Sequence, residues 1–422
     1  MKKKLLALLL TGAMVLSLAA CGADAGTADS AADATETQTE TTETEETTEE
    51  TAAAAETTDG AVTGTLKLGF IGPITGAAGQ YGSLANYGAQ IAVEELNALG
   101  NGLTIEYQPE DDVHDAETSV NAYNTLKDWN VQAIVGCVTT TPCIAVASEA
   151  YSDRVFMLTP SASSPKVTED RDNVYQVCFS DPNQGSKSAE YISENNLATK
   201  VAVIYNNADA YSTGIYQTFV SEAENRGLEV VSTTTFTDDT TDFSVQVTDA
   251  KNAGAELVFL PIYYQPASLI LSEMDKQGYE ATVFGVDGMD GILGIEGFDT
   301  SLAEGVMLLT PFAADATDDA TVSFVKKFND KAGETPSQFA ADAYDAVYTI
   351  VEALNAYAAK NGALDVTDLS AEELCDILIS TISSDDFSVD GLTGAGMKWN
   401  ASGEVNKSPK AVIIKDGVYV GM

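Results

Sequence analysis

The feature that most constrains the fold of this chain is a regular alternation of short apolar runs with longer amphipathic segments. LKLGFIG (66–72) predicts a buried strand, and the segment 84–100 predicts a helix because its apolar residues recur at helical spacing. The alternation continues through predicted strands at 103–109, 131–136 and 155–160, with helices predicted between them. Strands that are separated by helices of ten or more residues form parallel sheets covered by helices on both faces.

A second series of the same kind follows. Strands are predicted at 199–205, 228–236, 255–262 and 281–286, again with helices between them, and 305–311 predicts one more strand. Three further helices and a hairpin-like part complete the pattern. Two successive series predict an α/β fold with two doubly wound parallel-sheet lobes. Because such sheets bind ligands beyond the carboxyl ends of their strands, we expect the site in the loops that follow the strands.

The amino-terminal part has a different composition. Lys2 to Lys4 precede an apolar run of sixteen residues, which is shorter than the ~20 residues of a membrane-spanning helix and predicts a secretory signal over 1–20. The run ends in LAACG, which resembles the lipobox of bacterial lipoproteins, with Cys21 as the residue that would carry the lipid. The alternative is an ordinary secretory signal with an incidental cysteine. Residues 21–63 are rich in Thr, Glu and Ala and lack aromatic residues, so they predict a disordered acidic tether.

Charge narrows the possible partners. The 422 residues include 64 acidic and 21 basic ones, a formal net charge of −43. Twelve of the acids lie in residues 24–60, which hold no base, so residues 61–422 keep 52 acids and 18 bases, a net charge of −34. Such a field repels nucleic acids and anionic membrane surfaces. We therefore expect no nucleic-acid partner, and contact with the membrane only through the lipid on Cys21.

Histidine and cysteine limit the chemistry. The single histidine, His114, excludes a His-rich metal cluster, and its sequence EDDVHDAE predicts a surface-loop histidine held by acidic neighbours. Besides Cys21, the cysteines are Cys137, Cys143, Cys178 and Cys375. Their spacing matches no metal motif, and the sequence does not choose among the three possible full pairings and free buried thiols.

Several loops together resemble a known family. They are GPITGAAGQYG after the first predicted strand, VGCVTTT before the third helix, TPSASSP after the following strand, SDPNQG at 180–185 and MKWNASG at 397–403. Their order and spacing, from about Leu66 to about Gly417, are similar to those of the branched-chain amino-acid binding proteins of ABC importers, which are type I periplasmic binding proteins. The resemblance implies two α/β lobes, a three-segment hinge and Venus-flytrap closure over a ligand.

The resemblance also implies where the lobes begin and end. The chain of that family crosses between the lobes three times, which implies crossings here near 180–184, 308–313 and 396–404. The first lobe would comprise 64–182 plus 311–398, and the second 183–310 plus 399–422.

Ligand contacts are carried over from the family residue by residue. Thr140 and Ser163 would hold an α-carboxylate through backbone N–H and hydroxyl groups, and Thr139 competes with Thr140 because the TTTPC loop is one residue longer than usual. Ser161 would offer its carbonyl to the ligand ammonium group, and Asp287 would pair with that group as a carboxylate. The family's aromatic positions correspond here to Tyr81, Tyr211 and Tyr264.

Taken together, these features predict the extracytoplasmic substrate-binding component of an ABC importer. We expect it to be a monomer on the outer face of the cell membrane, of Gram-positive type, and to deliver a small aliphatic or branched-chain amino acid to permease subunits. No cofactor, no metal and no catalysis are expected. A ligand-sensing lipoprotein for amino acids or amides, without transport, is the alternative. An enzyme is disfavoured because neither the spacing of Cys137 and Cys143 nor the surroundings of His114 match a redox or hydrolytic motif.

Overall fold

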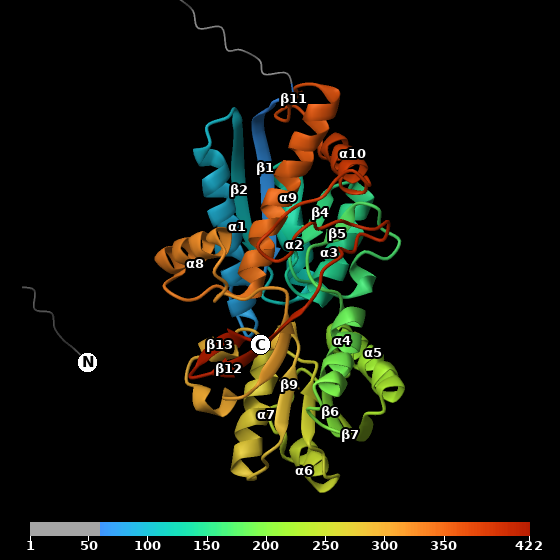
Figure 1. Ribbon diagram of the computed structural model, residues 1–422. Coiled ribbons are helices and arrows are strands. Elements are labelled where there is room, and N and C mark those ends of the chain that lie inside the picture. Colours follow the sequence, from blue (N-terminus) through green and yellow to red (C-terminus); the bar gives the residue numbers. More distant parts are fainter. Residues whose placement is uncertain (1–59) are drawn as a thin grey trace, which may run out of the picture. The chain divides into compact units, whose positions relative to one another are not determined.

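The structure of the protein is a computed structural model that describes residues 60–422 (Figure 1). The predicted signal, Cys21 and the predicted tether as far as residue 59 lie outside the described residues. Strand β1 begins at Val62, within the range predicted as tether, because Val62 and Thr63 pair with Leu364 and Asp365. Val62 is also buried in the core.

The first sheet is parallel and belongs to the first lobe. Its strands are β1 (Val62–Gly72), β2 (Leu103–Asp111), β3 (Ala133–Gly136), β4 (Phe156–Thr159), β5 (Val174–Gln176) and β11 (Leu364–Asp365). β1 lies between β2 and β3, which gives the order β2-β1-β3-β4-β5, with β11 paired to the start of β1. Its helices are α1 (Gly79–Ala98), α2 (Ala116–Asp128), α3 (Thr140–Asp153), α8 (Asp319–Ala332), α9 (Gln338–Asn361) and α10 (Ala371–Ile382). Every residue of β3 and β4 is buried, as expected for central strands covered on both faces.

The second sheet repeats this plan. Its strands are β6 (Lys200–Asn206), β7 (Glu229–Phe236), β8 (Leu257–Leu260), β9 (Thr282–Gly285), β10 (Met307–Thr310), β12 (Lys410–Lys415) and β13 (Val418–Gly421). The order is β7-β6-β8-β9-β10-β12-β13, and the last two strands form an antiparallel hairpin on the otherwise parallel sheet. Its helices are α4 (Asp181–Glu194), α5 (Ala210–Arg226), α6 (Ser244–Asn252) and α7 (Tyr264–Lys276). In both sheets the strand order reverses beside the first strand, between β1 and β3 and between β6 and β8.

Three connections join the two sheets: β5 to β6, β10 to β11 and β11 to β12. The predicted α/β fold of two doubly wound lobes with a three-segment hinge is therefore confirmed, and the lobe boundaries predicted at 182/183, 310/311 and 398/399 each fall within one of these connections. The third connection is held by a buried ion pair, because Lys407 Nζ lies 2.6 Å from Asp342 Oδ1 and 2.6 Å from Thr393 Oγ1.

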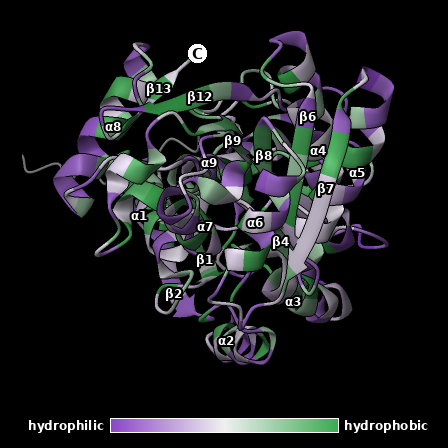
Figure 2. Ribbon diagram, turned by 90° about the horizontal axis from the view of Figure 1, so that it is seen from below, coloured by the Kyte–Doolittle hydropathy of each residue, from purple (hydrophilic) through white to green (hydrophobic). Residues whose placement is uncertain are grey.

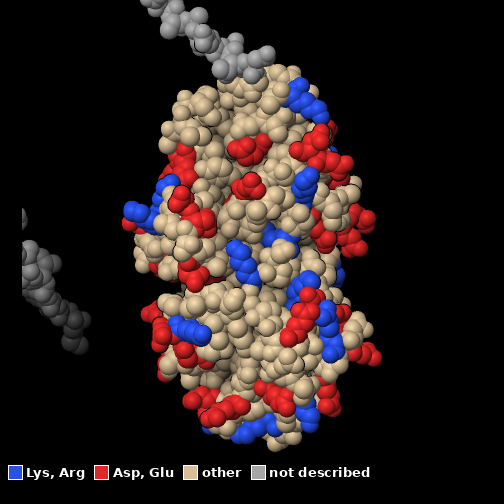
Figure 3. All heavy atoms as spheres, in the orientation of Figure 1, with Lys and Arg blue, Asp and Glu red and all other residues tan. Residues whose placement is uncertain are grey.

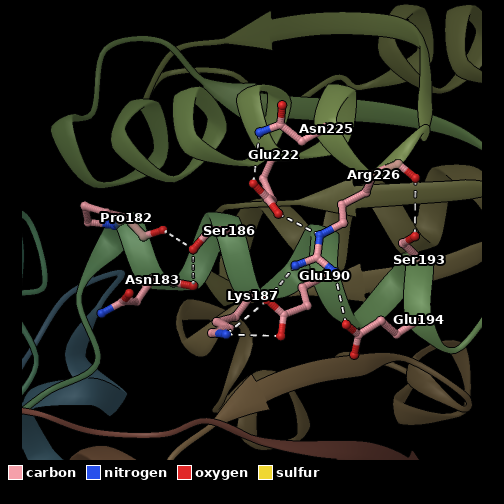
Figure 4. A network of polar contacts seen from close by, with 10 residues as sticks. All are labelled: Pro182, Asn183, Ser186, Lys187, Glu190, Ser193, Glu194, Glu222, Asn225 and Arg226. Carbon is pink, nitrogen blue, oxygen red and sulfur yellow. Dashed lines mark hydrogen bonds and ion pairs between the residues drawn. The ribbon is translucent and has the colours of Figure 1, made fainter.

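Close helix contacts fix each lobe. In the first lobe α1 crosses α9 at Gly88, where an added Cβ would lie 1.9 Å from the carbonyl oxygen of Ala340. In the second lobe Arg226 of α5 reaches Glu190 and Glu194 of α4 as well as Glu222 of its own helix (Figure 4). Glycine at the first contact allows the helices to approach closely, and the guanidinium fork at the second contact bridges two helix surfaces.

The distribution of residue types agrees with this layering. Hydrophobic residues run along β6, β8 and β9, whereas the edge strand β7, which is half exposed, is paler in Figure 2. On the face seen in Figure 3, acidic side chains are spread over both lobes, with basic side chains among them. The excess of acids is therefore a property of both lobes on this face and not of one patch.

Three elements of the structure, β5, α4 and β11, are absent from the sequence predictions. Strand β5 and helix α4 were not predicted, because SDPNQG reads as a turn; in the structure Ser180 precedes the helix and Pro182 stands in its first turn, where a missing N–H costs nothing. The four cysteines in the described part are free and buried, which resolves the pairing that the sequence left open.

Candidate ligand-binding site

Loops from both lobes meet around one small cavity of about 10 Å³. Each of these loops, except the segment before α9 that brings in Phe339, follows a strand at its carboxyl end, on both sides of the points where the strand order reverses. The lining residues are Tyr81, Val138, Thr139, Thr140, Ser161, Tyr211, Tyr263, Asp287, Gly288 and Phe339. The volume is close to the minimum that holds one water molecule, so the lobes are closed on each other here.

Asp287 is the charged group of the cavity. Its Oδ1 accepts a hydrogen bond of 2.5 Å from the Tyr211 hydroxyl, and its Oδ2 accepts one of 2.9 Å from Gln184 Nε2. The side chain is 3% exposed, and this burial raises the pKa of Asp287 to about 7. A buried carboxylate with neutral donors only is a natural partner for a cation.

On the opposite lobe the amino terminus of α3 faces the same cavity. Thr139 precedes the helix in an extended conformation, but its side chain makes no capping hydrogen bond. Its Oγ1 instead lies 2.8 Å from Nδ1 of His114. Helix amino termini present N–H groups without intrahelical acceptors and carry a partial positive charge, which favours an anion such as a carboxylate.

Aromatic rings form the walls. Tyr211 and Tyr263 are stacked with ring centroids 4.8 Å apart and planes within 3°. Tyr81 contacts Tyr263 and packs edge-on against Phe339 at 4.9 Å. A cavity with a carboxylate on one side, a helix amino terminus on the other and rings between them suits a small zwitterion with an apolar side chain.

Known proteins are similar to this chain. Residues 65–394, more than three quarters of the chain, match the family profile described as Periplasmic binding protein. The chain belongs to the periplasmic binding protein family. This confirms the family that the loop motifs predicted.

Relatives within the family are similar over much of this chain. A Leu/Ile/Val-binding protein homolog 3 of Brucella melitensis is 31% identical over 53% of this chain, and the match spans less than two thirds of that protein, 61% of its length. The Leu/Ile/Val-binding protein BraC3 of Rhizobium johnstonii is 29% identical over 70% of this chain and 76% of its own. Among solved structures, the branched-chain amino acid transporter substrate binding protein LivJ of Streptococcus pneumoniae, in complex with isoleucine, has 25% identity and a TM-score of 0.74, over 85% of this chain and 100% of its own.

Six of the eight predicted contact residues of this periplasmic binding protein line the cavity together: Tyr81, Thr139, Thr140, Ser161, Tyr211 and Asp287. Ser163 does not line it, because it is fully buried behind the loop and its carbonyl accepts the N–H of Asp181 at the first crossing. Tyr264 does not line it either. Its hydroxyl donates to the carbonyl of Ala77 at 2.9 Å, and its N–H donates to the Tyr81 hydroxyl at 3.1 Å, so it joins the lobes beside the cavity.

Sequence reasoning missed Val138, Tyr263, Gly288 and Phe339 among the lining residues, and it placed His114 differently. Tyr263 is the neighbour of the predicted Tyr264, and α7 begins between them, which turns the two side chains in different directions. Phe339 lies at the start of α9, far along the chain from the strand loops. His114 is not a plain surface-loop histidine, because its ring packs edge-on against Tyr263 at 5.6 Å and contacts Thr139. Burial lowers the pKa of His114, which favours the neutral ring.

Metal-ligand clusters and membrane-spanning helices are both absent from residues 60–422. In this part of the chain, no group of three or more His, Cys, Asp or Glu side chains is placed to hold a metal ion. Within the same range, none of the helices combines the length and the apolar character needed to cross a bilayer.

Proposed function

We propose that this chain is the substrate-binding component of an ABC importer, and that it captures a small aliphatic or branched-chain α-amino acid between its lobes. The observation that carries the proposal is the single cavity where Asp287 of one lobe faces the amino terminus of α3 from the other. The relatives named as Leu/Ile/Val-binding proteins, and the solved relative with isoleucine, support the ligand class. The bound amino acid is then passed to permease subunits, and no bond is made or broken.

Each end of the ligand has a partner in this proposal. The ammonium group pairs with Asp287, which Tyr211 orients through its hydroxyl, and the α-carboxylate takes the N–H and hydroxyl groups of Thr139 and Thr140. Tyr263 and Phe339 then cover the side chain, together with Tyr81 and Val138. Because the closed cavity of about 10 Å³ is far smaller than an amino acid, entry requires the lobes to separate about the hinge.

We also propose the remaining organisation expected from the sequence. The lobes comprise 64–182 plus 311–398 and 183–310 plus 399–422, and the protein acts as a monomer. A lipid on Cys21 and the acidic tether hold it outside the cell membrane, on a Gram-positive type of surface. The lipobox-like LAACG and the apolar run before it support this anchor.

The ligand proposal is tested by thermal unfolding of protein that has been refolded to remove carried-over ligand. Each of the twenty amino acids is added, and a true ligand at about 100 times its Kd should stabilise the fold by about 2.7 kcal/mol. Asp287→Asn should remove most of that shift, whereas Asp275→Asn, which removes an exposed carboxylate of the same lobe, should leave it unchanged. The ligand class is wrong if no amino acid raises the unfolding temperature, and the role of Asp287 is wrong if Asp287→Asn binds as tightly as the wild type.

Transport is separated from sensing by a second measurement. Cells that lack this protein should lose uptake of the labelled amino acid identified above, and the restored wild-type gene should return it. Unchanged uptake would favour the sensing lipoprotein over the importer component.

A further inference from the structure

A second, larger cavity of about 470 Å³ lies beside the connection from β10 to α8. It shares no lining residue with the cavity at Asp287. Figure 1 shows α8 next to the β12–β13 hairpin, and both contribute walls: Val325 comes from α8 and Val418 from β13. The volume is within the ~300–1,000 Å³ of typical small-molecule sites.

The inner walls of this cavity are largely apolar. Leu84 of α1 and Phe312 of the connection lie on the side of the first lobe, and Leu308 of β10 lies on the side of the second, all three of them buried. Leu293, which is partly exposed, continues the apolar wall toward solvent. A hydrocarbon group that enters between these residues would leave water at little cost, because the side chains are already in place.

The charges of the cavity are all negative. Its lining includes Asp290, Asp315 and Glu334 and no Lys, Arg or His. Asp290 is 7% exposed, and its Oδ2 accepts the N–H of Gln338 at 3.0 Å. Burial raises the pKa of Asp290 to about 6, against hydrogen bonds from Gln338, Gly291 and the Tyr419 hydroxyl, which lower it. Asp315 and Glu334 are exposed at the rim. A carboxylate that is buried beside apolar walls and has only neutral donors around it is complementary to a cation that carries its own donors.

We propose that this cavity binds an alkylammonium ion, with its ammonium group on Asp290 and its hydrocarbon chain against Leu293, Leu308 and Phe312. Asp315 and Glu334 at the rim raise the local concentration of such cations and meet a second ammonium group when the ligand has one. The amino-acid site is not involved, so this inference goes beyond the proposed function and does not depend on it.

The site also has a physical connection to the amino-acid cavity. Asp287 and Gly288 line the smaller cavity, and Asp290 and Gly291, which follow in the same turn, line the larger one. Both lobes supply walls to the larger cavity as well. An occupant therefore contacts the turn that carries Asp287 and Asp290, and it also contacts residues of both lobes, whose separation opens the amino-acid cavity.

The test is binding of a matched series to the full chain, measured by calorimetry at about 0.15 M salt so that long-range attraction is screened. The series is hexylamine, hexamethylenediamine, hexanol and hexanoate, which share one hydrocarbon chain. Both amines should bind, hexanol should bind at least about tenfold more weakly, and hexanoate should not bind, because a charge-assisted pair is worth more than a neutral contact. Hexanoate that binds as well as hexylamine, or amines that fail to bind at millimolar concentration, would overturn the proposal.

Variants locate the binding. Asp290→Asn should lower the affinity for hexylamine at least about tenfold, and Leu293→Trp should abolish it by filling the cavity. Leu293 is partly exposed, so this second variant keeps the test decisive if Asp290→Asn unfolds. Glu304→Gln removes an exposed carboxylate that does not line the cavity, and it should bind hexylamine like the wild type. Equal binding by Leu293→Trp and the wild type would mean general attraction to an acidic surface, and the site would be rejected.

Discussion

The buried ion pair of the third connection makes a quantitative prediction. The Lys407 side chain is 0% exposed and that of Asp342 is 2% exposed, and their charged atoms are 2.6 Å apart. In Lys407→Met, the methionine fills most of the space, but Asp342 keeps a buried charge without a cation. Removal of one partner of a buried pair typically costs about 3–5 kcal/mol, so we expect a loss of that size in the free energy of unfolding near pH 8.

The pH dependence identifies the cause of this loss. Burial raises the pKa of Asp342 to about 6 even beside Lys407, so without the cation it should rise further. A folded-state pKa above the unfolded value means that stability is present at low pH and is lost as the pH rises through the folded pKa. The deficit of Lys407→Met relative to the wild type should therefore be largest near pH 8 and less than about half as large near pH 5, where Asp342 is protonated in the variant.

Urea unfolding followed by tryptophan fluorescence measures the free energy of unfolding at pH 5 and at pH 8. Trp399 lies in the same connection and is buried, with its ring N–H donating to the carbonyl of Gln176 at 2.8 Å. Lys407→Met with Asp342→Asn should recover part of the loss, because the carboxylate in direct contact with the lysine is then neutral, whereas the buried Asp345, which Lys407 also stabilises, keeps only its hydrogen bonds from Leu392 and Thr393. Lys326→Met is the control, since this exposed lysine pairs only at the surface, and it should change little. An equal deficit at pH 5 and pH 8 would refute the electrostatic reasoning and leave packing as the cause.

Two further predictions follow from buried groups. The affinity for the amino-acid ligand should fall by up to about tenfold per pH unit below pH 7 and stay level above it, because protonated Asp287 cannot pair with an ammonium group. Calorimetry from pH 5 to pH 8 measures this affinity. The Asp287→Asn variant should show no such dependence on pH. Gly88→Ala should destabilise the first lobe by about 2 kcal/mol or more, because the new methyl group would overlap the carbonyl oxygen of Ala340. A midpoint of urea unfolding equal to that of the wild type would contradict the close crossing of α1 and α9 at this residue.

Much of the fold could be predicted because it depends on local patterns. Apolar runs of four to seven residues between amphipathic segments are typical of strands covered on both faces, and this favours parallel sheets. The antiparallel hairpin of β12 and β13 follows from Asp416 and Gly417, which take positive φ angles of 51° and 74° as a two-residue turn requires. Helix α4 was missed because its first turn contains Pro182, a residue that serves a turn equally well.

The site could be predicted only in part, for reasons of geometry. Residues that directly follow strands, such as Thr139 and Asp287, are brought together by the topology itself. Which of two adjacent tyrosines enters the cavity depends on the residue at which α7 begins, and here Tyr263 just before the helix lines the cavity while Tyr264 in its first turn does not. Phe339 reaches the cavity only through the second crossing, whose path depends on the packing of both lobes.

The hydrogen bonds that join the closed lobes use no atom of a ligand. The Tyr81 hydroxyl donates to the carbonyl of Gly288, the Tyr264 hydroxyl donates to that of Ala77, and Asp290 accepts the N–H of Gln338. Each is worth about 0.5–1.5 kcal/mol net, so together they shift the closing equilibrium by a factor of ten or more. Because the cavity of this closed form is too small for an amino acid, these bonds lower the apparent affinity of every ligand alike, whereas the contacts of Asp287 and the helix amino terminus differ between ligands. Tyr81 therefore takes part both in closure and in lining the cavity, whereas Tyr264 and Gln338 contribute to closure alone, so changes at these two residues should alter the strength of binding more than the choice of ligand.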